Sequence, residues 1–571
     1  MRAGEQEVDC RRPERCRVAK SALVLLLVTA FISSAFGSGP VGDDGDRRRV
    51  FRSARSTYVP IDSQAYAMFD RLISAGLVES SFVGIRPWTR VECARLVTEA
   101  ENNIDERTSK EMLGVIATLK AEFPPVDEEP TLPVEQVYTR FLGISGEPLR
   151  DSYHFGQTLV NDYGRPYWTG GNAFVGGSGA FAAGPFTVAA RGEYQYAPGG
   201  PVYAPSTQSL IKYTDGTPAP LLPDSRQISQ FRLLEAYVAF PIRNVEFSVG
   251  KQALWWGPDT SGAMLFSNNS EPPYMLHIAQ ISPVRLPWIF HYLGPMRLDG
   301  FFGKMAGHQY PSGPYFHGQK ITLKPTKNLE LGFSRTVVFA GAGRGLTFRS
   351  FWKSFISVGD YKGVISGGRN DVGDRRGGFD FSYRVPRLRQ WLLLTADMFT
   401  DDDPSPLAAP QRSAFTPGIY LSHVPGVPKL DLRVEAPTSS LPEMANTLGR
   451  FFYYNYAFFD GYTNKGMLIG HWIGRQSKAI VATSSYWFTP EKVLSTNFRH
   501  STTDPEFIAG GGNLTDLGAS YSSPLGKQFS VVGSAQFERW NYPGLMASPQ
   551  RNFVTSLELR WEPNKFLKVR K

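Results

Sequence analysis

FTVAARGEYQYA, residues 186–197, alternates between two kinds of side chain and decides the fold class. One face carries Phe186, Val188, Ala190, Gly192, Tyr194 and Tyr196. The other face carries Thr187, Ala189, Arg191, Glu193 and Gln195. This period of two residues predicts a β-strand with one apolar and one polar face. The pattern recurs in FDFSYRV (379–385), KLDLRVEA (429–436) and NFVTSLELRW (552–561), so the chain is mainly β.

A soluble β-sandwich would alternate in the same way, but the lengths of the connections favour a membrane barrel. Eighteen candidate strands run from 153–161 to 551–561, an even number, as in single-chain bacterial barrels. Connections on one side are short, for example 241–243, 325–328 and 489–491, whereas those on the other side are long, for example 197–228 and 437–477. The exception is 282–295, a long turn on the short side. We therefore expect a large antiparallel transmembrane β-barrel. Its charged inner faces are what a water-filled lumen permits, and the sequence leaves open whether the lumen is open or plugged.

The N-terminus reads as an export signal. Arginines and a lysine precede the apolar run Leu23–Ile32, and Ala35-Phe36-Gly37 offers a cleavage site. Removing residues 1–37, with six basic and four acidic side chains, changes the net charge from +9 to +7. Cys93 is then the one remaining cysteine, which excludes an intramolecular disulfide. A modest positive charge on an exported protein suits an acidic extracellular ligand or lipid head groups and argues against nucleic acid.

A small α-helical domain is expected between the leader and the barrel. Thr89 can cap a helix, and apolar residues recur at helical spacing on either side of it. The expected domains are a signal peptide (1–37), a flexible leader (38–57), a periplasmic helical domain (58–126), a linker (127–152), the barrel (153–561) and a periplasmic tail (562–571).

The segment Gly250–Leu286 is the strongest candidate for a sugar-binding element. Trp255 and Trp256 offer flat rings on which sugars stack, and Asn268 and Asn269 offer amides for hydroxyl groups. Packed tryptophans that brace the barrel mouth would give the same sequence, and both interpretations stay open.

Two further expected loops combine basic and aromatic side chains, a combination that suits an acidic polysaccharide. The candidate residues there are Arg344, Arg349, Trp352, Arg375, Arg376 and Trp472. Contact with lipopolysaccharide, or packing of the loops on themselves, is the alternative explanation.

Nothing in the sequence indicates catalysis. The eight histidines are scattered, with no HExxH and no pair at metal-ligand spacing, and no serine lies in a GxSxG. We expect no catalytic residues, no metal and no cofactor.

Several motifs resemble the Wzi capsule-assembly family. They are VPIDSQAYAMFDRLISAGLV (59–78), IRPWTR (85–90), GKQALWWGP (250–258), LFSNNSEPP (265–273), YTNKGMLIGHWIG (462–474) and QFERWNYPGL (536–545). The resemblance implies an eighteen-stranded barrel in the outer membrane of a Gram-negative bacterium, with a helical domain at its periplasmic mouth. It also implies a non-catalytic lectin that holds capsular polysaccharide. One departure is that ten residues follow Trp561, where outer-membrane barrels generally end on an aromatic residue.

Three functions are therefore weighed. The first is a monomeric outer-membrane lectin that anchors an exported, acidic capsular polysaccharide and contacts outer-membrane lipid and lipopolysaccharide. The second is a porin or sugar-uptake channel on the same barrel. The third is a barrel enzyme that trims surface glycans, for which the sequence supplies no paired-carboxylate cleft.

Overall fold

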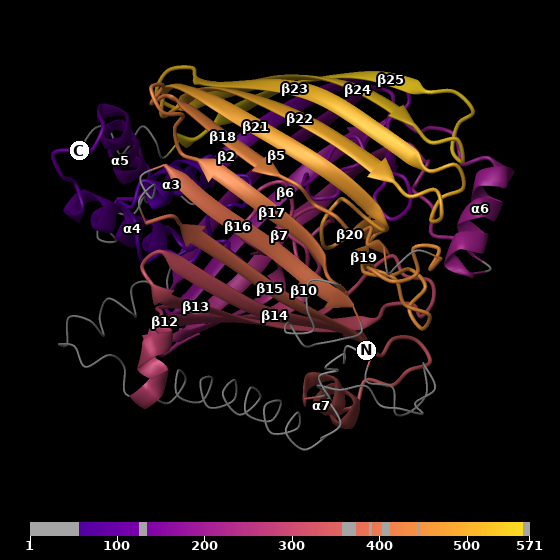
Figure 1. Ribbon diagram of the computed structural model, residues 1–571, viewed down its shortest axis with the longest axis horizontal. Coiled ribbons are helices and arrows are strands. Elements are labelled where there is room, and N and C mark those ends of the chain that lie inside the picture. Colours follow the sequence, from indigo (N-terminus) through magenta and orange to yellow (C-terminus); the bar gives the residue numbers. More distant parts are fainter. Residues whose placement is uncertain are drawn as a thin grey trace, which may run out of the picture.

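The computed structural model describes residues 56–124, 134–217, 219–356, 373–386, 391–401, 412–442 and 446–563. Eighteen antiparallel strands close into one barrel (Figure 1). They are β2 (Val134–Ser145), β5 (Gly170–Ala183), β6 (Phe186–Ala197), β7 (Ile228–Ile242), β8 (Val245–Lys251), β10 (Tyr274–Gln280), β12 (Pro295–Lys304), β13 (Tyr315–Thr326), β14 (Leu329–Phe339), β15 (Asp374–Arg384), β16 (Leu392–Asp401), β17 (Ala414–Leu421), β18 (Leu430–Glu435), β21 (Ser477–Thr489), β22 (Lys492–Thr503), β23 (Gly512–Pro524), β24 (Phe529–Asn541) and β25 (Gln550–Trp561). Each strand pairs with the next, and β2 closes the ring by pairing with β25.

The predicted number of strands is confirmed, but the first strand was placed wrongly. The barrel starts with β2 at Val134, whereas residues 153–161 form turns and the two-residue strand Gly156–Gln157 inside the loop after β2. The expected linker thus contains a strand. Leu142 and Ile144 of β2 point inward and pack against Tyr167 and Phe174, so both faces are apolar in the second half of this strand and its sequence lacks the expected alternation there.

The outer surface of the barrel is apolar, as the alternation predicts. In β6 the exposed residues are those of the predicted apolar face, and the residues of the polar face are buried in the lumen. Outward side chains such as Phe141, Val175 and Leu517 are 58%, 52% and 61% exposed. Such a band suits contact with hydrocarbon. None of the helices in the described part of the chain is both long and apolar enough to cross a membrane.

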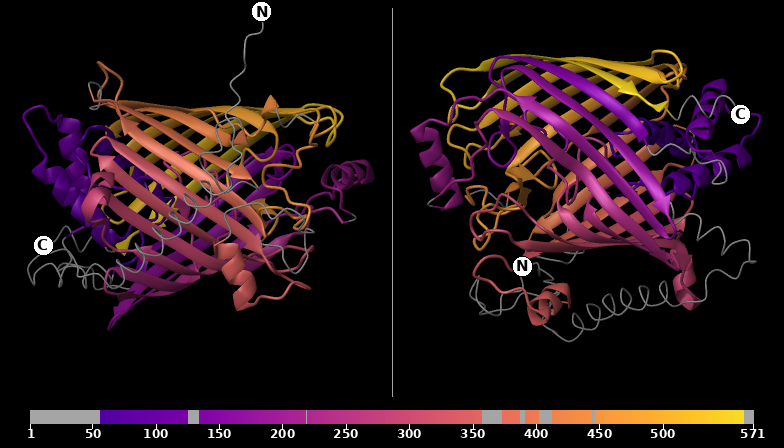
Figure 2. Two further views of the ribbon diagram at one scale, coloured as in Figure 1. Left: turned by 60° about the horizontal axis from the view of Figure 1, so that its bottom comes forward. Right: turned by 180° about the vertical axis from the view of Figure 1, so that it is seen from behind.

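The two ends of the barrel differ (Figures 1 and 2). We call the end with the short turns the helix end, because α3 (Ala65–Ser74), α4 (Arg90–Asn102) and α5 (Lys110–Glu122) cap it. The long turn 282–295, the exception among the short turns, lies at this end and holds β11 (Val284–Arg285) and the 3-10 helix η2 (Trp288–Leu293). The opposite loop end carries β3 (Arg150–Asp151), β4 (Gly156–Gln157), α6 (Pro205–Asp215), α7 (Phe348–Ile356), β19 (Thr463–Asn464) and β20 (Met467–Leu468).

The helical domain has its own core and holds the short turns. Thr89 caps α4 as predicted, its hydroxyl accepting a hydrogen bond from the Glu92 amide at 3.2 Å. Cys93 is fully buried in this core, as expected of a small hydrophobe. Arg71 donates to the carbonyl of Pro428 at 2.9 Å in the turn between β17 and β18. This contact fixes the domain to the helix end.

Segments from both ends meet inside the lumen. The strand β1 (Ile85–Arg86) of the helical domain pairs with β9 (Trp255–Trp256), which comes from the loop after β8. Gly257 extends the pairing by donating its amide to the Gly84 carbonyl at 3.1 Å. Residues 253–273 therefore fold into the barrel, although they were expected as a long outward connection.

Carboxylates that face the lumen bind the backbone of both of these segments, the one from the helical domain and the one from the loop after β8. Glu330 accepts the amides of Val83 and Gly84 at 3.1 and 2.9 Å. Glu435 accepts those of Thr260 and Ser261 at 2.9 and 2.8 Å. These charged groups are buried and bonded to segments that fill the lumen, residues 83–86 and 253–273 with the loops packed on them, which we call the plug.

Candidate functional site

The loop end is closed by a buried aromatic core. The aromatic-rich segment 451–472, which suggested an exposed sugar platform, supplies much of that core. Its buried members are Phe452, Tyr453, Tyr454, Phe458, Tyr462 and Trp472. Tyr453 donates its hydroxyl to the Met264 carbonyl at 2.7 Å and so joins this loop to the plug. These rings are packing residues.

A chain of buried charges ties three loops together at the loop end. His154 lies between Asp151, whose carboxylate is 2.8 Å from Nδ1, and Asp215, whose carboxylate is 2.9 Å from Nε2. Arg475 donates to the other oxygen of Asp215 at 2.6 Å. Burial alone would lower the pKa of His154, but the two carboxylates raise it to about 9. Burial alone would raise the pKa of Asp215, but His154 and Arg475 lower it to about 2.

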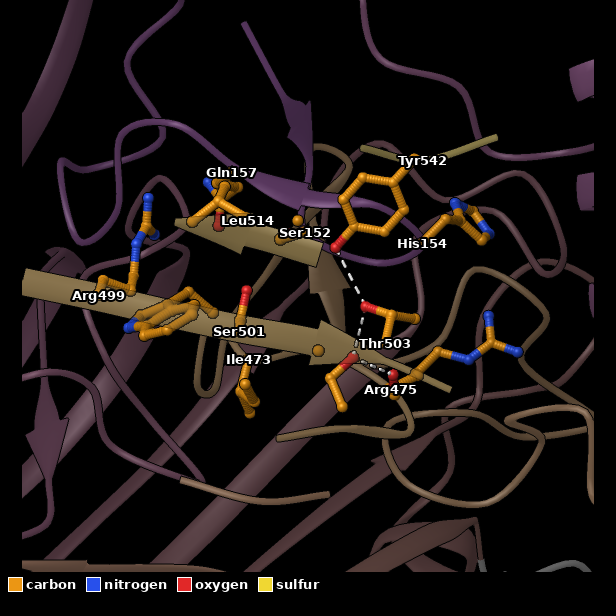
Figure 3. A pocket seen from close by; sticks show the side chains of 14 residues that line it. Ser152, His154, Gln157, Ile473, Arg475, Arg499, Ser501, Thr503, Leu514 and Tyr542 are labelled. Carbon is orange, nitrogen blue, oxygen red and sulfur yellow. Dashed lines mark hydrogen bonds between the residues drawn. The ribbon is translucent and has the colours of Figure 1, made fainter. Parts of the chain in front are cut away.

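A small cavity lies beside this chain (Figure 3). Its wall includes the hydroxyl of Thr503, 2.9 Å from the Ser477 hydroxyl and 3.0 Å from that of Tyr542. The volume of about 10 Å³ suits a single water molecule and excludes a sugar ring.

Exposed aromatic and basic side chains gather at the C-terminus of α6, which projects from the loop end (Figure 1). Arg450 donates to the last carbonyls of the helix, at 2.6 Å for Thr214. Tyr213 is 68% and Tyr456 is 62% exposed, and the ring of Tyr456 packs at 5.1 Å on Tyr454, whose hydroxyl binds the Asp215 carbonyl. We call Lys212, Tyr213, Arg450 and Tyr456 the α6 patch.

Lys212, Tyr213 and Arg450 of the α6 patch were missed from the sequence. The segment Pro205–Asp215 begins with proline and ends before Gly216, which has φ +65°. Those two residues are the signal that could have revealed a helix within the long loop. Without that helix, nothing distinguished Lys212 and Tyr213 from other loop residues.

The predicted tryptophan and asparagine sites lie inside the plug. Trp255 and Trp256 are 4% and 1% exposed, and the Trp256 indole donates to Asp299 at 3.1 Å. The Asn269 side chain accepts the amide of Asn161 at 3.1 Å, and Asn268 is 3% exposed. Of the two interpretations left open, this burial supports bracing of the barrel mouth.

Three more predicted residues are also buried. Trp472 is 3% exposed and donates its indole N–H to the Ser261 carbonyl at 2.7 Å. Arg376 is 0% exposed, 3.2 Å from Asp401 and ion-paired with Asp374. Its neighbour Arg375 is 6% exposed. As the chain is folded here, none of the three presents its side chain to a ligand at the surface.

The remaining predicted residues lie near the surface but apart from the α6 patch. Arg344 rests over the Phe458 ring at 4.8 Å. Arg349 and Trp352 belong to α7, which lies against the outside of the barrel wall (Figure 2). Arg335 of that wall donates to the carbonyls of Ser354 and Phe355 at 2.8 and 3.0 Å, which caps the C-terminus of α7. The structure thus divides the predicted site between plug, loop end and outer wall.

No group of three or more His, Cys, Asp or Glu side chains suited to a metal ion occurs among the residues that the structure describes.

Comparison with known proteins identifies a family and a fold. A family model described as capsule assembly protein Wzi matches residues 142–555. An uncharacterized 55.8 kDa protein in the cps region of Klebsiella pneumoniae is 28% identical over 213 residues, which are 36% of this chain and 40% of that relative. The chain thus matches less than half of that relative's length.

Among solved structures, the chain is similar to Wzi of Escherichia coli, described as an outer membrane protein involved in group 1 capsule assembly and as a carbohydrate binding β-barrel. The two share 16% identity with a TM-score of 0.66, over 89% of this chain and 99% of that one. At this identity the likeness shows the barrel fold.

Proposed function

This chain belongs to the capsule assembly protein Wzi family, and we propose that it is a non-catalytic outer-membrane lectin that binds an exported, acidic capsular polysaccharide and anchors it at the cell surface. The observation that carries the proposal is the family match over residues 142–555, most of the chain. The carbohydrate binding described for Escherichia coli Wzi supports the choice of ligand.

The apolar outer surface and the two different ends support the proposed orientation. The barrel spans the outer membrane of a Gram-negative bacterium as a monomer, with the loop end outside and the helical domain in the periplasm. Long loops outside and short turns inside are the usual arrangement of such barrels. The exposed rings of Phe348 and Trp352 on α7, 79% and 45% exposed, suit contact with lipid rather than with sugar.

Within the loop end, the α6 patch is the surface that best suits an acidic sugar. Tyr213 and Tyr456 can stack on the apolar faces of sugar rings, and Lys212 and Arg450 add positive charge beside them. The buried charges Asp215 and Arg475 hold α6 in place from below. The polysaccharide would therefore meet a surface that is already ordered.

The alternative of a porin is disfavoured by the plug. The β1–β9 pair, the carboxylates bonded to its backbone and the aromatic core at the loop end occupy the lumen. The purified protein is expected to give no sustained ion conductance in a planar lipid bilayer. Steady conductance from the wild-type protein would favour the channel.

The decisive experiment is a capsule-retention assay in a capsulated strain. Deletion of the gene is expected to shift polysaccharide from the cell-bound to the soluble fraction without lowering the total amount. If the cell-bound fraction is unchanged, the anchoring proposal fails.

A binding assay then tests the α6 patch. The double variant Tyr213→Ala/Tyr456→Ala is expected to bind purified acidic capsular polysaccharide at least ten-fold more weakly. Each ring is expected to contribute on the order of 1 kcal/mol by stacking, and a ten-fold change corresponds to about 1.4 kcal/mol. The matched control is Tyr292→Ala, a tyrosine that is 82% exposed in η2 at the helix end. Equal weakening of both proteins would remove the α6 patch from the proposal.

A further inference from the structure

The barrel wall has a notch at its loop end, next to β7. Strand β8 stops at Lys251, which pairs with Ala236, but β7 continues to Ile228. Over Ile228–Glu235, the strand pairing in the described residues is with β6 alone. The gap beyond the ends of β8 and β10 forms a cavity of about 260 Å³.

The inner side of this notch is closed by the plug. The turn between β19 and β20 lies there, where Asn464 donates to the Glu271 carbonyl at 2.7 Å and the Lys465 amide donates to the Ala306 carbonyl at 2.7 Å. The strand residues at the rim point outward: Phe231 is 66% and Tyr274 is 61% exposed. In β10, Tyr274 and Leu276 are exposed while the alternate residues Met275 and His277 are buried. The mouth therefore faces the surroundings of the barrel.

Positive charge exceeds negative charge in the notch. Glu271 is ion-paired with Arg232, Lys251 and Lys465, the last at 2.9 Å. Lys304 lines the same cavity, so four basic side chains and one carboxylate surround it. The side chains of Lys251 and Glu271 are 5% and 4% exposed, so this pair is buried, whereas Lys304 and Lys465 are accessible from outside.

Crowding of the cations also affects the pKa of Lys465. Burial and the nearby Arg232 guanidinium both lower the pKa of this lysine. An anion entering the notch would relieve this repulsion and accept charge-assisted hydrogen bonds from several donors at once. A site with these properties is built for a compact, multiply charged anion.

We infer that the notch binds a phosphate group of a phosphorylated glycolipid in the outer leaflet of the membrane. Three features favour a lipid over the capsular polysaccharide. The mouth opens through the wall rather than onto the loop end, its rim carries outward aromatic rings, and the cavity is smaller than the roughly 300–1,000 Å³ of pockets for larger ligands. The inference rests on the proposed outer-membrane location but not on polysaccharide binding.

The test measures binding of lipid A to the full chain in detergent, by native mass spectrometry. The probes are bisphosphorylated lipid A, the same lipid without phosphates and inorganic phosphate. The variants are Lys304→Gln and Lys465→Gln, both surface-accessible, and the matched control is Lys478→Gln, an exposed lysine at the loop end of β21. Each notch variant is expected to weaken binding of the bisphosphorylated lipid about ten-fold, as loss of one charge-assisted hydrogen bond predicts. The control variant and the dephosphorylated lipid mark the non-specific level.

Several outcomes would overturn the inference. One is equal binding of phosphorylated lipid by the notch variants and the control, and another is equal binding of the two lipids. A third is that a soluble acidic oligosaccharide displaces the lipid from the wild-type protein and fails to bind both notch variants. That result would assign the notch to the polysaccharide. Inorganic phosphate is expected to compete only at high concentration, because it lacks the acyl chains; competition as strong as that of the lipid would assign the notch to free phosphate. Capsule retention by the notch variants is measured separately, so failure of the anchoring proposal leaves this test intact.

Discussion

Raising the pH is expected to loosen the loop end through His154. Its pKa is raised from 6.5 to about 9 in the folded chain by Asp151 and Asp215. Protonation of His154 therefore stabilises the folded loops fully below about pH 6.5, and this contribution is lost as the pH rises through 9. The difference between the two pKa values corresponds to about 3 kcal/mol, since each unit is worth 1.36 kcal/mol. His154 is 3% exposed, so solvent screening does not reduce this figure appreciably.

Hydrogen exchange followed by mass spectrometry measures this effect. The free energy of local opening of α6 and of residues 146–169 should fall by about 2–3 kcal/mol between pH 6.5 and pH 9, after correction for intrinsic exchange rates. In His154→Gln the opening free energy should be low at both pH values, because glutamine carries no charge. The matched control His423→Gln, at the helix end, should behave as wild type in these peptides. A wild-type pH dependence no larger than that of His154→Gln would refute the reasoning.

Three other substitutions test the plug and the helical domain. Glu330→Gln should lower the free energy of opening of residues 81–88 by about 2 kcal/mol, because it weakens the acceptor for the amides of Val83 and Gly84; unchanged exchange there would contradict the proposed anchoring of the plug. Trp256→Ala should lower the unfolding free energy by roughly 3–5 kcal/mol, seen as a lower temperature for loss of the compact band in heat-modifiability gels. Polysaccharide binding per folded molecule should persist, and selective loss of binding at normal stability would show ligand contact. Thr89→Ala should cost about 1 kcal/mol of protection in α4 by hydrogen exchange, with no change in α5.

Alternation predicted the barrel well because it reports a local property. In β25 the predicted outward residues, among them Leu557 and Leu559, are exposed, and Glu558 between them is buried. The membrane side of every strand must be apolar whatever fills the lumen, so this half of the pattern is always legible. The lumen side carries no such rule. β2 was overlooked because Leu142 and Ile144 face an apolar part of the plug.

The candidate site was less predictable because burial of an aromatic loop is a tertiary property. Trp256 and Tyr453 are aromatic, as a sugar-binding surface requires, but they lie in the buried core. Their burial depends on a plug that joins residues near 85, near 256 and near 460. No local sequence pattern predicts these long-range contacts. Trp487 and Trp540 show the same effect: they lie near strand ends but turn inward, and their indole N–H groups donate to Asp431 and to the Glu147 carbonyl.

The way in which the strand carboxylates grip the plug bears on how this family can diverge. Glu330 and Glu435 bind main-chain amides, which every residue except proline supplies. Substitutions at Val83, Thr260 or Ser261 therefore leave the grip in place, whereas replacement of either glutamate removes it. Among homologues we expect the acidic positions of the wall to be retained while the plug side chains facing them drift. Selection inside such a barrel would thus act more strongly on the acidic residues of the wall than on the plug side chains that face them.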